Sequence, residues 1–160
     1  MRLALVCVGR LKAGPERELF DRYWKRLGDS ARGIGIAGVD CREIPESRAR
    51  RPEDRRAEEG AAILSGLAAG GELVALDERG ASLTSEEWAA DLARARDASR
   101  PVYAVIIGGP DGLDPALRAK AQRVVSFGAM TWPHQLVRVM ACEQLYRLVS
   151  ILSGRPYHRV

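Results

Sequence analysis

Residues 101–107, Pro-Val-Tyr-Ala-Val-Ile-Ile, form an uninterrupted apolar run that is followed directly by Gly108 and Gly109. A strand of this composition carries apolar side chains on both faces, so both faces must be covered. A parallel sheet with helices on both sides meets this requirement, whereas a sheet with one solvated face does not. The run therefore predicts an α/β fold with a mostly parallel sheet.

Strand and helix patterns alternate along the rest of the chain. Strands are expected at residues 2–8, 34–44, 72–76 and 124–127, and helices at 15–27, 52–69, 84–96, 114–122 and 133–153. Thr84 and Glu87 form a capping-box pattern at the start of one helix. No repeat or linker divides the 160 residues, so we expect one domain, residues 1–160, with a five- to six-stranded sheet.

Several common kinds of site are missing from the sequence. There is no G-x-x-x-x-G-K-[ST] phosphate loop, and two His with three widely spaced Cys make a metal site unexpected. Residues 33–38 satisfy the dinucleotide pattern G-x-G-x-x-G, but a polar turn precedes them and a strand pattern follows, so they predict a glycine-bearing strand. No apolar run approaches the ~18 residues of a membrane span, no signal peptide is recognised, and the odd cysteine count predicts reduced thiols in the cytoplasm.

Three loops that follow predicted strands are candidates for a ligand site. They are residues 108–112, residues 127–134 and residues 77–80. Ligands of open α/β sheets bind at the carboxyl ends of strands, and glycines there let backbone groups approach a ligand closely. The loops therefore predict a crevice. Each also fits a structural interpretation: a tight turn for 108–112, and a helix entry with Met130 and Trp132 packed in the core for 127–134.

The formal charge of +4 lies in the last 60 residues. Residues 1–100 carry 18 basic and 18 acidic residues, whereas residues 101–160 carry seven basic and three acidic ones. A basic end is compatible with a polyanionic partner, but it is also common in proteins without one. The tail 155–160 adds Tyr157 and His158 to these cations, which suits contacts with phosphate and a base, although a frayed terminus is the default. The run 48–56 is matched by nearby acids and is interpreted as a solvated loop and helix start.

Five segments of the chain together resemble a known family. They are L-x-x-V-G-R-L-K at residues 5–12, V-I-I-G-G-P-D-G-L at 105–113, M-T-W-P-H-Q-L-V-R-V at 130–139, E-Q-L-Y-R at 143–147 and P-Y-H-R at 156–159. The combination of G-G-x-x-G, M-T-x-P-H and a Tyr-His tail is highly specific. The chain resembles, over essentially its whole length, the ribosomal large-subunit methyltransferase H family of the SPOUT superfamily.

The resemblance implies a SPOUT-type α/β fold with a C-terminal trefoil knot that makes the pocket for S-adenosylmethionine. Carried over by motif, the cofactor-binding residues are Leu76, Gly108, Phe127, Gly128, Ala129, Met130, Thr131 and Trp132. Backbone groups of these loops would hold the cofactor, which explains why no G-x-G-x-x-G loop is required. A homodimer is also implied, and the apolar final helix fits burial against a second subunit.

The resemblance further implies methylation of N3 of a pseudouridine in 23S ribosomal RNA within the assembled ribosome. His158 is the candidate for substrate orientation or proton acceptance, and Tyr157 would stack on or hydrogen-bond the target base. Arg138, Arg155 and Arg159 would hold phosphates, while His134 fits a structural role slightly better than a catalytic one. Two alternatives stay open: a SPOUT enzyme acting on another RNA such as transfer RNA, and a non-catalytic ribosome-binding protein.

Overall fold

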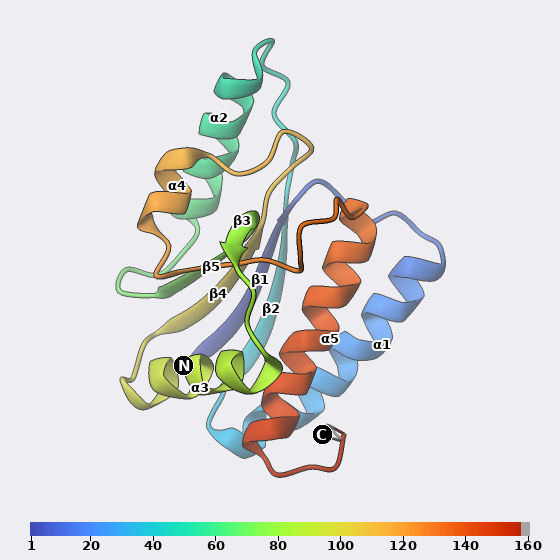
Figure 1. Ribbon diagram of the computed structural model, residues 1–160, viewed down its shortest axis with the longest axis vertical. Helices are drawn as coiled ribbons and strands as arrows, with labels where there is room; N and C mark the ends of the chain where they lie inside the picture. The colour runs from blue at the N-terminus through green and yellow to red at the C-terminus, as the bar shows by residue number, and fades with distance from the viewer. Residues whose placement is uncertain (158–160) are drawn as a thin grey trace.

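The computed structural model describes residues 1–157, and in this part of the chain five strands form one parallel sheet (Figure 1). The strands are β1 (Arg2–Val8), β2 (Gly38–Ile44), β3 (Glu72–Ala81), β4 (Val102–Ile107) and β5 (Arg123–Val125), in the order β2-β1-β4-β3-β5. Every neighbouring pair is parallel. The predicted α/β class and parallel sheet are confirmed.

Helices cover both faces of the sheet. One face carries α1 (Pro15–Ala31), α3 (Ser85–Asp97) and α5 (His134–Leu152), and the other carries α2 (Pro52–Ser65) and α4 (Pro115–Lys120) (Figure 1). Tyr103, Val105 and Ile107 point into the first layer, whereas Ala104 and Ile106 point into the second. This alternation explains why the strand is apolar throughout. No helix within residues 1–157 has both the length and the apolar character that a membrane crossing requires.

Helix starts follow the sequence closely because their side chains satisfy backbone N–H groups. Thr84 accepts a hydrogen bond from the Glu87 backbone N–H at 3.1 Å, and the Glu87 carboxylate accepts one from the Thr84 N–H at 2.8 Å. Asp114 accepts a hydrogen bond from the Leu117 N–H at 3.3 Å, with Pro115 in the first turn of α4. These are the donors that a helix N-terminus otherwise leaves unpaired.

Several element ends differ from the prediction. Helix α1 continues past Gly28 to Ala31, because Gly28 packs beside Val39 and does not turn the chain. Residues Arg32–Ile34 form a short 3-10 helix and Gly35 has a φ of 80°, so β2 begins only at Gly38. Helix α2 ends at Ser65, several residues earlier than expected.

Strand β3 extends five residues beyond the predicted end and folds over β5. Leu76 and Ala81 both pair with Val125, and the Ser126 N–H donates to the Ala81 carbonyl oxygen at 2.9 Å. A Cβ placed on Gly80 would lie 2.6 Å from the Val125 carbonyl carbon. Only glycine therefore allows this crossing. The crossing lies where the resemblance expects the knot, and the knot itself stays a prediction.

Candidate active site at the carboxyl edge of the sheet

The carboxyl ends of β3, β4 and β5 open into one cavity of about 460 Å³. Seven of the residues expected to bind the cofactor line it: Leu76, Gly108, Phe127, Gly128, Met130, Thr131 and Trp132. Ala129 is not part of the lining. The structure thus brings together the three loops that the sequence selected, and their role as cofactor ligands stays a prediction.

The loop after β4 presents its backbone to the cavity. Gly109 and Gly112 form an isolated bridge in which the Gly112 N–H donates to the Gly109 carbonyl oxygen at 2.9 Å. Gly112 has a φ of 85°, and a Cβ on Gly108 would lie 2.8 Å from the Gly112 carbonyl carbon. This tight turn therefore needs glycine, and it leaves no side chain between the backbone and a ligand.

The loop between β5 and α5 is held by the side chain of Ser126 and carries exposed apolar side chains. Ser126 Oγ accepts a hydrogen bond from the Gly128 N–H at 3.1 Å and donates to the Gly128 carbonyl oxygen at 3.0 Å. Met130 is 69% exposed and Trp132 is 36% exposed. The structural interpretation that placed these two side chains in the core is wrong, because the loop turns them outward along the cavity.

Two ion pairs organise the polar side of the cavity. Asp77, the first residue after the predicted end of β3, accepts a hydrogen bond from Arg118 of α4 at 3.1 Å. Asp111 accepts from Arg55 of α2 at 2.6 Å and 3.0 Å, in the bidentate geometry of a guanidinium and a carboxylate. The hydrogen bonds from Arg55 hold the pKa of Asp111 below its ordinary value. Each carboxylate is therefore partnered by a guanidinium.

No motif in the sequence indicates that α2 takes part in this site. Arg55 and Asp111 are 56 residues apart, and Arg55 also donates to the carbonyl oxygens of Ala49 and Arg50 at 3.0 Å and 3.1 Å. Arg56 lines the cavity itself. The only signal was the charged run 48–56, whose local pattern indicates a solvated helix start. That pattern does not reveal the ion pair, because Asp111 lies on a loop far away in the sequence.

His134 lies at the first position of α5 and lines the cavity. Its side chain is exposed and makes no hydrogen bond to any residue in the part of the chain that the structure describes. The expected structural role of His134, in which it caps the knot, therefore has no contact to support it. Its place on the cavity wall keeps it available to a ligand.

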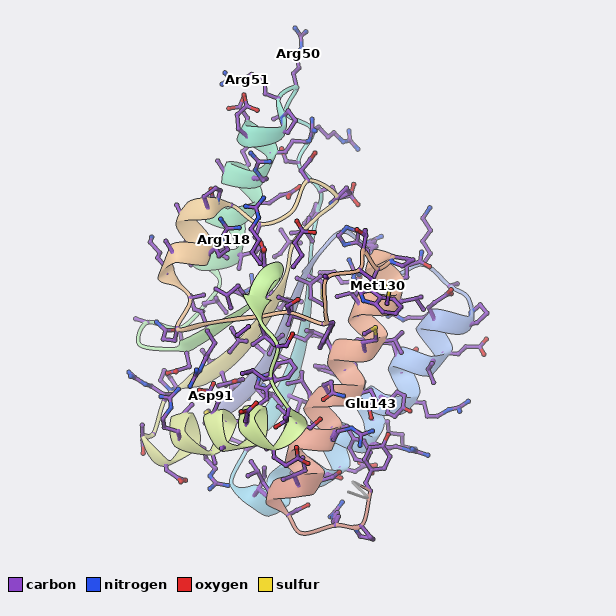
Figure 2. All side chains as sticks on the ribbon, in the orientation of Figure 1. Arg50, Arg51, Asp91, Arg118, Met130 and Glu143 are labelled. Carbon is purple, nitrogen blue, oxygen red and sulfur yellow. The ribbon has the colours of Figure 1, made fainter. Side chains whose placement is uncertain are left out.

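Tyr157 and Arg155 follow the last turn of α5. Tyr157 donates a hydrogen bond to Glu143 Oε1 at 3.0 Å, and its ring packs on Tyr146 with a centroid distance of 4.5 Å. Glu143 is the middle residue of α5, whereas Met130 lies near its upper end (Figure 2). Nine positions, about 13 Å of helix, separate Glu143 from His134 at the cavity, and Tyr157 is not part of the cavity lining. His158 and Arg159 lie outside the described residues.

Burial and the Glu143 carboxylate raise the pKa of Tyr157 above its ordinary value. The phenol therefore keeps its proton at neutral pH and can donate a hydrogen bond but cannot act as a phenolate base. Arg155 Nη1 donates to Ser30 Oγ at 2.6 Å, on the same end of the molecule.

Arg138 does not fit the phosphate contact expected of it. Its side chain is buried, and Nη2 donates to the carbonyl oxygens of Val8 at 2.5 Å and Gly9 at 2.9 Å. Nη1 lies 3.3 Å from Glu43 Oε1. The guanidinium is hydrogen-bonded to backbone carbonyl oxygens at the end of β1, so in this structure its role is structural.

Comparisons with known proteins agree with this geometry. A family profile described as "Predicted SPOUT methyltransferase" matches residues 1–158. The chain is 57% identical over 159 residues to the Ribosomal RNA large subunit methyltransferase H of Xanthobacter autotrophicus, a match that covers 99% of each chain. It is 59% identical over 160 residues to the same-named protein of Methylobacterium radiotolerans, covering 99% of this chain and 98% of that one.

Similarity to solved structures is much weaker. The SpoU methyltransferase AviRb from Streptomyces viridochromogenes, solved in complex with the cofactor AdoMet, has a TM-score of 0.42 at 15% identity, and the match covers 91% of this chain and 57% of that chain. No conclusion is drawn from a score this low. The full-length sequence matches are sufficient: the chain belongs to the SPOUT methyltransferases and, among them, to the ribosomal RNA large subunit methyltransferase H family.

Proposed function

We propose that this chain, as a single domain of residues 1–160, transfers a methyl group from S-adenosylmethionine to N3 of a pseudouridine in 23S ribosomal RNA. It acts in the bacterial cytoplasm on the assembled ribosome. The observation that carries the proposal is the cavity at the carboxyl ends of β3, β4 and β5, lined by glycine backbone and apolar side chains in a member of this family. The high identity to proteins named for this RNA supports the choice of substrate.

The cavity fits a nucleoside-sized cofactor. A volume of about 460 Å³ lies within the range typical of small-molecule sites. Leu76, Ile107 and Phe127 provide apolar wall for an adenine ring, while the backbone of Gly108 and of the loop 127–132 provides polar partners for the ribose and the methionine part. When bound, S-adenosylmethionine supplies an activated methyl group on a sulfonium. The chain's own task is then to align donor and acceptor.

The acceptor side of the site is completed by a second copy of the chain. Four large apolar side chains are exposed among the described residues: Leu19, Met130, Trp132 and Leu136. They lie near the start of α1, on the cavity loop and at the start of α5, where a homodimer would bury them. The tail of one copy then lies at the cavity of the other, because Tyr157 does not line the cavity of its own protomer.

The tail residues contact the target base and the RNA backbone in this arrangement. Tyr157 donates a hydrogen bond to the target base or stacks on it, and His158 orients the base or accepts the N3 proton. Arg155 and Arg159 hold phosphates of the RNA. Glu143, which now accepts the Tyr157 hydrogen bond, keeps the phenol protonated until the base replaces it.

The test is transfer of labelled methyl from S-adenosylmethionine to free 23S RNA, isolated large subunits and whole ribosomes from cells that lack this protein. Label on one pseudouridine, mainly in whole ribosomes, is the expected result. Label on transfer RNA in a parallel reaction would show a SPOUT enzyme with another substrate. No binding of S-adenosylmethionine would indicate a non-catalytic ribosome-binding protein.

A further inference from the structure

We propose that the RNA backbone is held at the mouth of the cavity by a cationic rim, which we define as Arg56 and Arg79 on the cavity wall with Arg48 and Arg50 at the tip of α2. The inference rests on the proposed function, because it takes the substrate to be RNA. It places phosphate contacts on α2, on the loop before it and on β3 of the protomer that holds the cofactor. These contacts add to those proposed for Arg155 and Arg159 of the tail.

Most arginines of the C-terminal segment are paired with acids in the part of the chain that the structure describes. Four of its arginines pair with acids: Arg118 with Asp77 at 3.1 Å, Arg123 with Asp91 at 2.7 Å, Arg138 with Glu43 at 3.3 Å and Arg147 with Glu143 at 2.5 Å. Three of these acids belong to the first 100 residues, which are neutral by composition. Folding therefore moves unpaired positive charge from the C-terminal segment to the N-terminal part of the chain.

Some of the cations without an ion pair within residues 1–157 lie at the carboxyl edge of the sheet. Arg56 and Arg79 line the cavity, and neither forms an ion pair within residues 1–157. The one side-chain hydrogen bond of Arg56 is a long contact, 3.4 Å, to the Asp111 carbonyl oxygen. Arg79 is exposed on the β3 extension that folds over β5. A guanidinium held at the mouth of a ligand cavity without an acid is suited to a phosphate.

The free cations continue from the cavity to the tip of α2. Arg48 and Arg50 are exposed, and within the described residues their side chains form no ion pair. Figure 2 shows Arg50 extending from the tip of α2 into solvent, with Arg118 below it toward the cavity. Arg51 at the same tip is held by Asp54 at 2.7 Å, so it is excluded from the rim.

The acids of the cavity do not cancel the rim. Asp77 is neutralised by Arg118 and Asp111 by Arg55, which leaves Glu78 as the cavity-lining acid without an ion pair in the described part of the chain. Glu78 lies next to Arg79 in the sequence and is exposed. Removing the charge of Glu78 should therefore raise the affinity for RNA, whereas removing the charge of Arg79 should lower it. The proposal thus predicts changes of opposite sign for two neighbouring residues.

The experiment measures binding of the full-length protein to purified ribosomes at several KCl concentrations, with bound S-adenosylmethionine. Arg56→Gln and Arg79→Gln each reduce the magnitude of the slope of log K against log[KCl] by roughly 0.7–0.9, the value of one lost phosphate contact. The double variant Arg48→Gln/Arg50→Gln lowers it as well and cannot disturb the cavity. Glu78→Gln tightens binding.

Arg32→Gln is the matched control, because Arg32 is an exposed arginine without an ion pair within residues 1–157, at the opposite edge of the sheet. It should leave the slope unchanged. The affinity for S-adenosylmethionine, measured separately, should be unchanged in all variants. If Arg56→Gln and Arg79→Gln weaken the cofactor and leave the salt slope intact, the two arginines form a cofactor subsite and the rim is overturned.

The failures of the two proposals can be told apart. Wild-type protein that methylates ribosomes while the rim variants keep the wild-type slope overturns the rim alone. Wild-type protein that neither binds nor methylates ribosomes overturns the proposed function, and the rim with it.

Discussion

The Arg138 guanidinium lies 2.9 Å from the carbonyl oxygen of Gly9, a residue 129 positions earlier in the chain. This contact fixes the start of α5 to the end of β1, beside the loops that carry the cavity. It also explains why a buried arginine lies among the mostly apolar buried residues of α5. Two carbonyl oxygens at the end of β1 need donors, and a guanidinium supplies both from one side chain.

Arg138→Met should destabilise the fold by roughly 2–4 kcal/mol, because it leaves the carbonyl oxygens of Val8 and Gly9 buried without a donor. Urea unfolding followed by fluorescence measures the change. The salt slope of ribosome binding should not move, since this arginine is unavailable to RNA. A normal stability combined with a lower slope would instead return Arg138 to the phosphate-binding role.

Asp111→Asn should weaken S-adenosylmethionine about 5- to 20-fold, equivalent to roughly 1–2 kcal/mol, because Arg55 no longer holds the loop 108–112 in a bidentate pair. Calorimetric titration gives the affinity. Arg51→Gln is the control, since it breaks the Arg51–Asp54 pair on the same helix but does not touch the loop. An equal loss of cofactor affinity in the two variants would mean that α2 affects cofactor binding only through the stability of the helix.

Gly80→Ala should cost roughly 1–3 kcal/mol through overpacking, because its Cβ would lie 2.6 Å from the Val125 carbonyl carbon. The β3 extension must then move away from β5, so cofactor affinity should fall as well. Gly33→Ala is the comparison, because a Cβ there meets nothing within 4 Å. Its unfolding free energy should stay within about 0.5 kcal/mol of wild type.

Asp91 connects α3 to the sheet in a buried polar network. It accepts hydrogen bonds from Arg94 at 2.7 Å, Arg123 at 2.7 Å and Tyr103 at 2.9 Å. Burial raises the pKa of Asp91, but these three hydrogen bonds together outweigh it and hold the pKa below its ordinary value. Asp91→Asn should cost roughly 3 kcal/mol at neutral pH.

The pH dependence of that difference has a definite sign. Because the folded pKa of Asp91 is lowered, its contribution is complete above the unfolded pKa of about 3.9 and is lost as pH falls through the folded value. The gap between wild type and Asp91→Asn should therefore be constant near neutrality and narrow below about pH 4. A gap that widened on acidification would show that Asp91 is protonated in the native state.

Local sequence decided most of the elements. The apolar run of β4 required covered faces, and the structure supplies a helix layer on each. The Thr84–Glu87 pair and the Asp114–Pro115 pair predicted two helix starts because capping involves residues three or fewer positions apart. The glycines of the loop 108–112 predicted a close backbone turn, which the Gly109–Gly112 bridge confirms.

Tertiary contacts decided what local pattern could not contain. The β3 extension depends on pairing between Ala81 and Val125, residues far apart in the chain, so residues 77–80 looked like a loop. Which positive charges stay unpaired also depends on tertiary contacts. Composition put the positive excess in the last 60 residues, but the buried or partnered state of an arginine depends on which acid or carbonyl the fold brings to it.

The sequence by itself determined the fold class, the family and the three loops that meet at the sheet edge, because periodicity, capping and motif are local properties of the chain. Only the tertiary structure shows that Arg138 is a structural group, that Arg55 holds Asp111, and that Tyr157 lies beside Glu143 in the middle of α5, outside the lining of its own cavity. Each of these depends on distances between residues separated by many positions, and only the packed sheet and its helices set such distances.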